Sequence, residues 1–293
     1  MKSFLIKFGI ITIIVSATTL GLKISFPTVK NYNSAMVDKL NLLKKNKSKQ
    51  KILLIGGSSV GWGLSAELIE KATNIPTINL GHHIGFGLVD FQEFIISSLT
   101  PNDIIIFSPE WEFYTDPTYY DLATFDDLCQ NNQYLEQTNK PLKTSIKSIL
   151  LKKIYFYKPN DKKTPYRYDC INQNGDVISH CGLIAKVPEK YSVQLQHFDQ
   201  NLFRKTFQYI SKTKCILLFP PTQKSIYQEN KKSFDELQAL LSKSNLNYLD
   251  SISSNVYDEV DFYDKQYHLK CEIKMKRSEK VISYILNTIR SSK

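Results

Sequence analysis

The sequence lacks the patterns that mark most nucleic-acid-binding and metal-binding modules. It has five cysteines, but no C-x-x-C pair and no cysteine and histidine spacing typical of a zinc site. It also has no helix-turn-helix, zinc-finger or RNA-recognition signature, so the net charge of +10 does not by itself indicate nucleic-acid binding. We interpret the excess of lysine as a solvated basic surface. We expect no nucleic-acid partner, no metal and no other cofactor.

Internal repeats are absent as well, which argues against a solenoid or an array of small modules. The 293 residues have an ordinary apolar content, enough for one large domain or two small ones. The number of cysteines is odd, and Cys170 and Cys181 bracket the turn-like segment Asn172–Asp176. Two interpretations remain open for that pair: a disulfide in an oxidising compartment, or two free thiols.

The N-terminus carries a targeting signal, in which Lys2 and Lys7 precede an uncharged run at 8–22. The run is short for a membrane crossing, which needs about 20 apolar residues, but flanking apolar residues extend it and terminal lysines can snorkel. We predict that residues 1–26 form an uncleaved single-pass membrane anchor, with the domain on the extracytoplasmic side of a bacterial cell envelope. The alternatives are a signal-peptidase site at Val15–Ala17 and a buried core helix. Lysines after the segment oppose this orientation, although large domains translocate despite such charge.

Downstream, short apolar runs alternate with turns and helical patterns. The runs at 51–55, 104–107 and 215–219 are typical of buried strands, and helical periodicity follows them. This repetition predicts a parallel sheet covered by helices. We interpret 27–50 as a linker and 51–293 as one α/β domain. Within that domain, about 111–188 forms an insertion over the sheet edge that offers a substrate or partner surface.

The stretch at 51–63 organises the rest of the chain, because its apolar run leads directly into a turn that contains Ser58 and Ser59. Ligands of open α/β sheets bind at the carboxyl ends of the strands, so both serines are expected at that edge, near helix N-terminal amides. A serine needs a positioned base to act as a nucleophile. His268 can supply the imidazole and Asp264 the orienting carboxylate, with Asp261 as an alternative acid. Without that chemistry, the turn is a helix cap and His268 is a structural histidine.

These features together resemble the SGNH (GDSL-type) hydrolases and acyltransferases, in particular the membrane-anchored branch linked to acylation of surface polysaccharides. The resemblance covers roughly 51–110 and 212–290. The first family block, Gly-Asp-Ser, is matched by Gly-Gly-Ser or by Gly-Ser-Ser. The nucleophile is therefore Ser58 or Ser59, and the strand-to-serine spacing favours Ser58. The last block resembles Asp264 through His268.

The resemblance also implies an oxyanion site. Asn79-Leu80-Gly81 matches the second block and implies that the Gly81 amide stabilises an oxyanion, together with turn amides such as that of Gly57. The third block normally carries an asparagine, and here that position reads Ser108-Pro109-Glu110. A carboxylate repels an oxyanion unless it is protonated or turned away. The predicted oxyanion- or substrate-binding residues are therefore Gly57, Asn79, Gly81 and Glu110.

The implied fold is a three-layer, doubly wound, flavodoxin-like parallel sheet. The implied function is an esterase or O-acyltransferase that acts on acyl esters of cell-envelope glycans. Its expected partners are an acylated glycan or acyl donor, the membrane through the N-terminal helix, and a membrane-bound acyltransferase. One alternative is a catalytically silent SGNH-like domain that binds glycan or such an acyltransferase. Two further alternatives are a glycosidase that uses Glu110 and Glu112, and substrate or metal binding by His82 and His83.

Overall fold

The computed structural model describes most of the chain outside the middle of the predicted insertion. The described residues are 2–25, 32–89, 91–121, 124, 163–186, 188, 191–193, 195, 198–211, 214–244 and 246–291. Much of the predicted insertion at 111–188 therefore lies outside the described residues.

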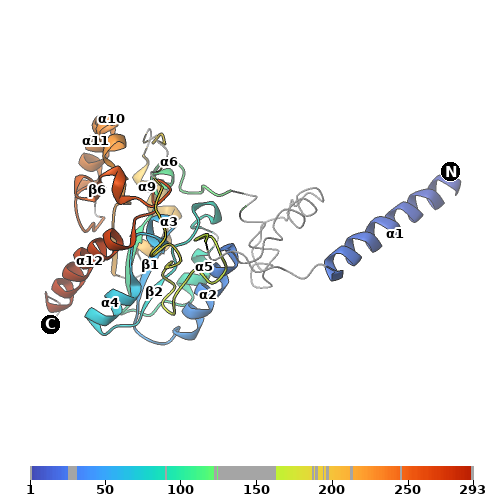
Figure 1. The fold of residues 1–293 in the computed structure, drawn as a ribbon, viewed down its shortest axis with the longest axis horizontal. Helices are drawn as coiled ribbons and strands as arrows, with labels where there is room; N and C mark the ends of the chain where they lie inside the picture. The colour runs from blue at the N-terminus through green and yellow to red at the C-terminus, as the bar shows by residue number, and fades with distance from the viewer. Residues whose placement is uncertain are drawn as a thin grey trace.

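A parallel four-stranded sheet forms the centre of the domain (Figure 1). Its strand order is β2 (Thr77–Asn79), β1 (Ile52–Gly56), β3 (Ile104–Ser108) and β4 (Lys214–Leu217). This order confirms the α/β prediction and is consistent with a flavodoxin-like fold. The register pairs Gly56 with Ser108, so the carboxyl ends of β1 and β3 lie side by side.

Helices cover both faces of the sheet, because successive strand side chains point to opposite sides. Ile52 and Leu54 face α4 (Ala66–Thr73) and α12 (Cys271–Ser291). Leu53 and Ile55 belong to the core of the other face, which contains α2 (Ala35–Lys45), α5 (Gln92–Ile96), α9 (Gln200–Thr206) and α11 (Lys231–Ser242). The remaining short elements are η1 (Tyr32–Ser34), α3 (Ser58–Gly61), η2 (Ile84–Phe86), α6 (Trp111–Thr115), η4 (Gln208–Ser211), β5 (Thr222–Gln223), α10 (Lys224–Glu229), η5 (Ser253–Asn255), β6 (Val256–Tyr257) and η6 (Glu259–Asp261).

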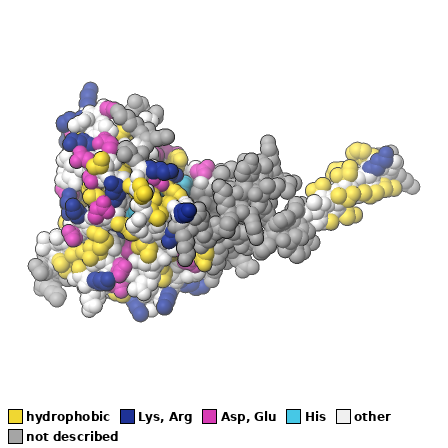
Figure 2. Space-filling view, in the orientation of Figure 1, with side chains coloured by type: hydrophobic (Ala, Val, Ile, Leu, Met, Phe, Trp, Pro, Cys, Tyr) yellow, Lys and Arg dark blue, Asp and Glu magenta, His cyan; other side chains and the backbone are white. Residues whose placement is uncertain are grey.

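The N-terminal segment folds as a helix, α1 (Lys2–Ser25), with apolar side chains exposed along it (Figure 2). In the part of the chain that the structure describes, no helix combines the length and the apolar character needed to cross a membrane. The predicted N-terminal membrane helix is therefore not found. Lys7 and the hydroxyl groups of Thr12 and Ser16 reduce the apolar character of this helix.

Residues predicted to be a linker contribute to the core. Met36, Leu40 and Leu43 of α2 are buried in the cluster that contains the side chains of one sheet face. Lys39 on the same helix is fully buried and donates a hydrogen bond to the Gly81 carbonyl. The packed domain therefore begins well before residue 51.

The last helix, α12, presents a mixed stripe to the domain. Val281 and Ile285, four residues apart on one face of the helix, are fully buried. One and two turns earlier, the same stripe continues with buried Lys274, Arg277 and Ser278. The polar half of this stripe lies toward the carboxyl edge of the sheet, where the Arg277 guanidinium contacts the β1–α3 turn.

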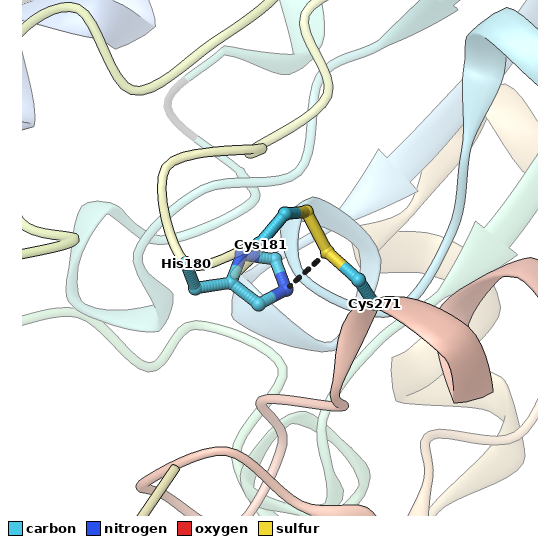
Figure 3. Close-up of side chains that lie close together, drawn as sticks. All are labelled: His180, Cys181 and Cys271. Carbon is cyan, nitrogen blue, oxygen red and sulfur yellow. Dashed lines mark hydrogen bonds between the residues drawn. A yellow bond between two sulfur atoms is a disulfide. The ribbon is translucent and has the colours of Figure 1, made fainter. Parts of the chain in front are cut away.

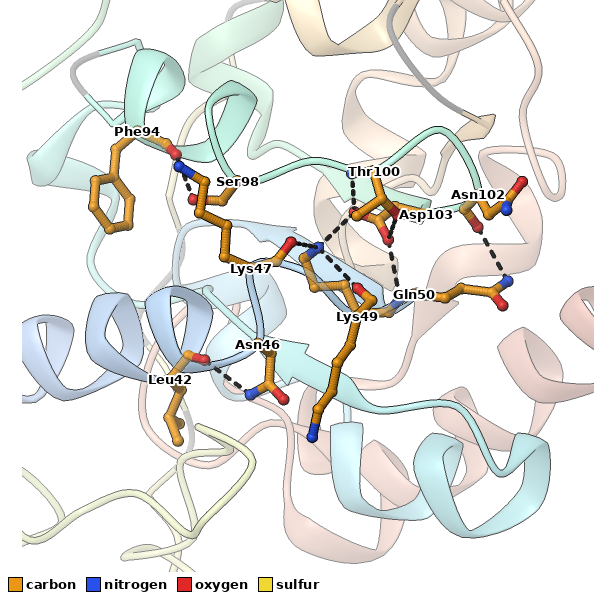
Figure 4. A network of polar contacts seen from close by, with 11 residues as sticks. Leu42, Asn46, Lys47, Lys49, Gln50, Phe94, Ser98, Thr100, Asn102 and Asp103 are labelled. Atoms are coloured by element: carbon orange, nitrogen blue, oxygen red, sulfur yellow. Dashed lines mark hydrogen bonds and ion pairs between the residues drawn. The ribbon is translucent and has the colours of Figure 1, made fainter.

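A buried ion pair fixes the opposite edge, where β1 and β3 begin (Figure 4). The Lys51 ammonium lies 2.7 Å from Asp103 Oδ2, and both side chains are fully buried. The Lys51 and Thr100 amides also donate to this carboxylate. Removing one member of such a pair leaves an uncompensated charge in the interior.

We predict that Asp103→Asn lowers the free energy of unfolding by about 3 kcal/mol, because it leaves the Lys51 ammonium without its counter-ion. Urea denaturation measures this loss. Asp235→Asn is the matched control: its ion pair with Lys231 is exposed, and its removal should change stability little. Equal effects of the two variants would contradict the prediction.

Candidate functional site

The two serines of the β1–α3 turn occupy different environments. Ser59 is fully buried, and its hydroxyl donates to the Ser108 carbonyl at 2.8 Å. Ser58 keeps 8% of its surface exposed, and its hydroxyl bonds to no other described residue. Of the two predicted nucleophiles, only Ser58 therefore has a free and accessible hydroxyl.

The carboxylate of Glu110 binds the backbone on both sides of Ser58. Its Oε2 accepts from the Gly57 amide at 3.0 Å, and its Oε1 accepts from the Ser59 amide at 2.8 Å. A Cβ at position 57 would overlap this carboxylate, so the close approach requires glycine there. Glu110 is fully buried, which raises the pKa of its carboxyl to about 7 despite the bond from the Ser59 amide. Its predicted role in oxyanion or substrate binding is replaced by a role in holding the turn.

The Arg277 guanidinium binds the same turn from α12. It donates to the carbonyls of Ser59 and Gly63, to the Ser108 hydroxyl and to the Phe219 carbonyl. It therefore connects the turn after β1 with the ends of β3 and β4. Burial lowers the pKa of Arg277 to about 10, so the group remains charged at neutral pH.

The predicted histidine and aspartate meet on a tight turn. His268 Nδ1 lies 2.8 Å from Asp264 Oδ1. The Tyr263 amide donates to the His268 carbonyl, and Phe262 forms an antiparallel bridge with Leu269. This reversal of the chain accommodates the four-residue spacing between the acid and the base.

Tyr166 completes this pair from the insertion. Its hydroxyl donates to Asp264 Oδ2 at 2.6 Å. Burial alone would raise the pKa of Asp264, but the bonds from His268 and Tyr166 lower it below its ordinary value. Burial also lowers the pKa of His268. An ionised Asp264 favours the proton on His268 Nδ1, which leaves Nε2 as the basic nitrogen.

Trp62 joins the histidine to the serine turn. It follows α3 directly, and its amide donates to the Ser58 carbonyl. Its indole stacks on the His268 ring with centroids 4.0 Å apart and an interplanar angle of 5°. The indole N–H donates to the Tyr32 hydroxyl, which fixes the orientation of the ring. His268 therefore lies at the C-terminal end of the short helix that Ser58 begins.

Most of the predicted oxyanion donors are engaged within the protein. The Gly57 amide binds Glu110, and the Gly81 amide binds Asn79 Oδ1 at 3.0 Å. Asn79 is itself fully buried, and its amide nitrogen donates to Val60, Leu64 and Asp176. The Ser58 amide, first in α3, has no acceptor among the described residues. It is the N–H at this turn that is left for a ligand.

His82 and His83 do not form a metal set with other described residues. His82 Nε2 bonds to the Tyr32 carbonyl, which can only accept, so Nε2 carries the proton. His83 Nδ1 accepts from the Gly85 amide, and burial lowers the pKa of His83 to about 4. Both histidines line a small pocket with a volume of about 20 Å³. Its other lining residues are mostly apolar and include Met36, Ile55, Gly56, Leu80, Phe86, Leu88 and Phe91.

The two glutamates after β3 both bind protein groups. Glu112 accepts from the Tyr267 hydroxyl at 2.8 Å and from the Gln266 amide. Burial raises the pKa of Glu112. Because Glu110 is fully buried under the serine turn and Glu112 is held by Tyr267, the arrangement gives the glycosidase alternative no support.

A disulfide anchors the segment that carries Tyr166. Cys181 bonds to Cys271 at the start of α12, and His180 Nε2 lies 3.4 Å from the Cys271 sulfur (Figure 3). Neither interpretation left open for Cys170 and Cys181 therefore holds in full: Cys170 is a free, buried thiol, whereas Cys181 pairs with Cys271. His180, Cys181 and Cys271 are the one group of three metal-type ligands among the described residues, and the disulfide occupies both sulfurs.

Comparison with known proteins identifies no relative: no family model, curated protein or solved structure matches the chain.

Several residues of the site carry no signal in the sequence that marks them as functional. Arg277 lies on the inward stripe of α12, four residues before Val281, but an arginine in an amphipathic helix is ordinarily expected at the surface. Tyr166 lies in a segment that contains several other tyrosines, and Trp62 lies in a glycine-rich turn, so neither stands out in the sequence. The polar interruption of the apolar stripe of α12 is the pattern that could have identified Arg277.

We predict that Ser59→Ala lowers the free energy of unfolding by about 1 kcal/mol, because it removes the hydrogen bond to the Ser108 carbonyl. Ser58→Ala should change stability by less than about 0.5 kcal/mol, since its hydroxyl makes no such bond. Urea denaturation of both variants tests this difference. A larger loss in Ser58→Ala than in Ser59→Ala would reverse our assignment of the two hydroxyls.

We also predict that removing the disulfide with Cys181→Ser lowers stability by about 2–4 kcal/mol, since Cys181 and Cys271 close a long loop. Thermal unfolding with and without a reductant measures the effect. Reductant should lower the Tm of the unmodified protein and leave that of Cys181→Ser unchanged. A reductant effect of equal size in both proteins would place the sensitive bond elsewhere.

Proposed function

We propose that this protein is an SGNH-like serine esterase or O-acyltransferase that acts on acyl esters of cell-envelope glycans. In this mechanism Ser58 attacks the acyl carbonyl while His268 accepts the serine proton and passes it to the departing alcohol oxygen as the ester C–O bond breaks. Water or a sugar hydroxyl, deprotonated by His268, then takes the acyl group from Ser58, and Asp264 orients the imidazole throughout. The Ser58 amide stabilises the oxyanion. The observation that carries the proposal is the Asp264–His268 pair stacked on Trp62 at the end of the helix that begins at Ser58.

The chemistry of each group supports these roles. His268 is held in the tautomer that a general base needs, and its lowered pKa keeps it neutral at physiological pH. The positive end of α3 and the unengaged Ser58 amide favour negative charge beside the serine.

We further propose that the domain works outside the cytoplasm. The Cys181–Cys271 disulfide supports this location, because such bonds persist mainly in oxidising compartments. A reporter fused after residue 293, read for activity on each side of the membrane, tests the location directly.

A second candidate function is a catalytically silent domain that binds an acylated glycan or a membrane-bound acyltransferase. The observation that favours it is the engagement of the Gly57 and Gly81 amides by Glu110 and Asn79. Only one turn amide then remains for an oxyanion, whereas most acyl-transfer sites supply more than one donor.

Labelling with a fluorophosphonate separates the two candidates. We predict that the purified full chain is modified at Ser58, and that His268→Ala lowers the labelling rate at least 100-fold, because the serine then loses its base. Peptide mapping identifies the modified residue. Asp235→Asn is the control, since Asp235 is exposed on α11 and pairs with Lys231 outside the site, and it should label at the rate of the unmodified protein.

Modification of Ser59, or equal rates with and without His268, would contradict this mechanism. Absence of any label on the folded protein, combined with binding of an acylated glycan that survives Ser58→Ala, would favour the silent binding domain instead.

A further inference from the structure

The most unusual group near the candidate nucleophile is the buried carboxylate of Glu110. Its two oxygens accept hydrogen bonds from the amides of Gly57 and Ser59, the residues before and after Ser58. Two hydrogen bonds to the two oxygens of one rigid group constrain the backbone at Ser58 from both sides. The full constraint requires both oxygens to accept, which only the ionised carboxylate does well.

We propose that ionised Glu110 is the positioning residue of this site, which holds Ser58 in its reactive orientation and releases the turn when it is protonated. This inference rests on the proposed function, because it concerns the reactivity of Ser58. It predicts that the protonation of Glu110, rather than that of His268, sets the acid limit of that reactivity.

The groups around Glu110 allow it to titrate near neutral pH. The α3 turn offers it amides and no charged side chain. From the other elements, Glu112 of α6, the Tyr267 hydroxyl and the Arg277 guanidinium of α12 interact with it electrostatically. Burial has the largest effect and raises the pKa of Glu110 to about 7, while the pKa of His268 lies below its ordinary value. As the pH falls, Glu110 is therefore protonated before His268.

The sign of the stability effect favours a functional role over a structural one. The folded-state pKa of Glu110 is raised, so the folded protein holds this proton more tightly than the unfolded chain does. Stability from this group is therefore present at acidic pH and is lost as the pH rises toward about 7. The ionised form that best holds the turn is retained at a cost in stability, which is typical of active-site groups.

The test is the pH dependence of fluorophosphonate labelling in the full chain and in Glu110→Gln. Glutamine approximates the protonated acid at every pH, since it offers one accepting oxygen. For the unmodified protein we expect the labelling rate to fall with a midpoint near pH 7. In Glu110→Gln the rate at pH 8 should be at least tenfold lower, and the midpoint should move to the lower pKa of His268.

Glu112→Gln is the matched control. It removes a neighbouring charge and keeps both turn contacts, so the labelling rate at pH 8 should persist and the midpoint should move slightly lower. An unchanged midpoint in Glu110→Gln would overturn the positioning role while leaving Ser58 as the nucleophile.

A second measurement does not depend on reactivity. In the unmodified protein, the NMR signals of the Gly57 and Ser59 amides should titrate together with a midpoint near pH 7. Amides that titrate in a protein that is never labelled would support the contact between ionised Glu110 and the turn, but would reject the proposed function and, with it, the role of that contact in reactivity. Amides that do not titrate between pH 5 and pH 8 would overturn the inference, even if Glu110→Gln fails to fold.

Discussion

Backbone groups buried at the β1–α3 turn need hydrogen-bond partners, and the candidate site is arranged around supplying them. At this turn the amides of Gly57 and Ser59 and the carbonyls of Ser59 and Gly63 belong to buried residues, so they need hydrogen-bond partners within the protein. Glu110 provides an anion for the amides and Arg277 a cation for the carbonyls. The two side chains come from segments far apart in the chain, so the turn can adopt this form only when the sheet and α12 are assembled.

The same constraint explains the buried charges near the site. Lys39 donates to the Gly81 carbonyl and Lys274 donates to the Val177 carbonyl, each in an interior where an ammonium is costly. Burial lowers the pKa of Lys39 to about 7. Such groups add little net stability, but alternative arrangements of the surrounding loops would leave a buried charge without a partner and so have a higher free energy. The proposed arrangement of Ser58, His268 and Asp264 depends on such a single arrangement of the loops.

Several parts of this arrangement could be predicted from local sequence. The apolar runs of β1 and β3, the glycines after β1 and the period of α12 each reflect interactions within a few residues. The Asp264–His268 pair could also be predicted, because the two residues are four apart in the sequence and lie on one turn. Tyr166, Trp62 and Arg277 could not, since a single tyrosine, tryptophan or arginine has many possible partners. The cysteine pairing was out of reach for the same reason: Cys271 is 90 residues from Cys181, and spacing alone could only suggest the nearer Cys170 as one possible partner.

The sequence by itself determined the class of fold and placed a serine turn and an Asp264–His268 pair in the chain, because hydrophobic periodicity and turn-forming residues act locally. Tertiary structure alone decided which serine has a free hydroxyl. It also turned Glu110 from a predicted ligand of substrate into a ligand of the backbone. The physical reason is that burial and hydrogen-bond partners are set by packing between distant segments. Ser58 and Ser59 are adjacent in the sequence, yet the Ser59 hydroxyl donates to the Ser108 carbonyl and the Ser58 hydroxyl bonds to no other described residue.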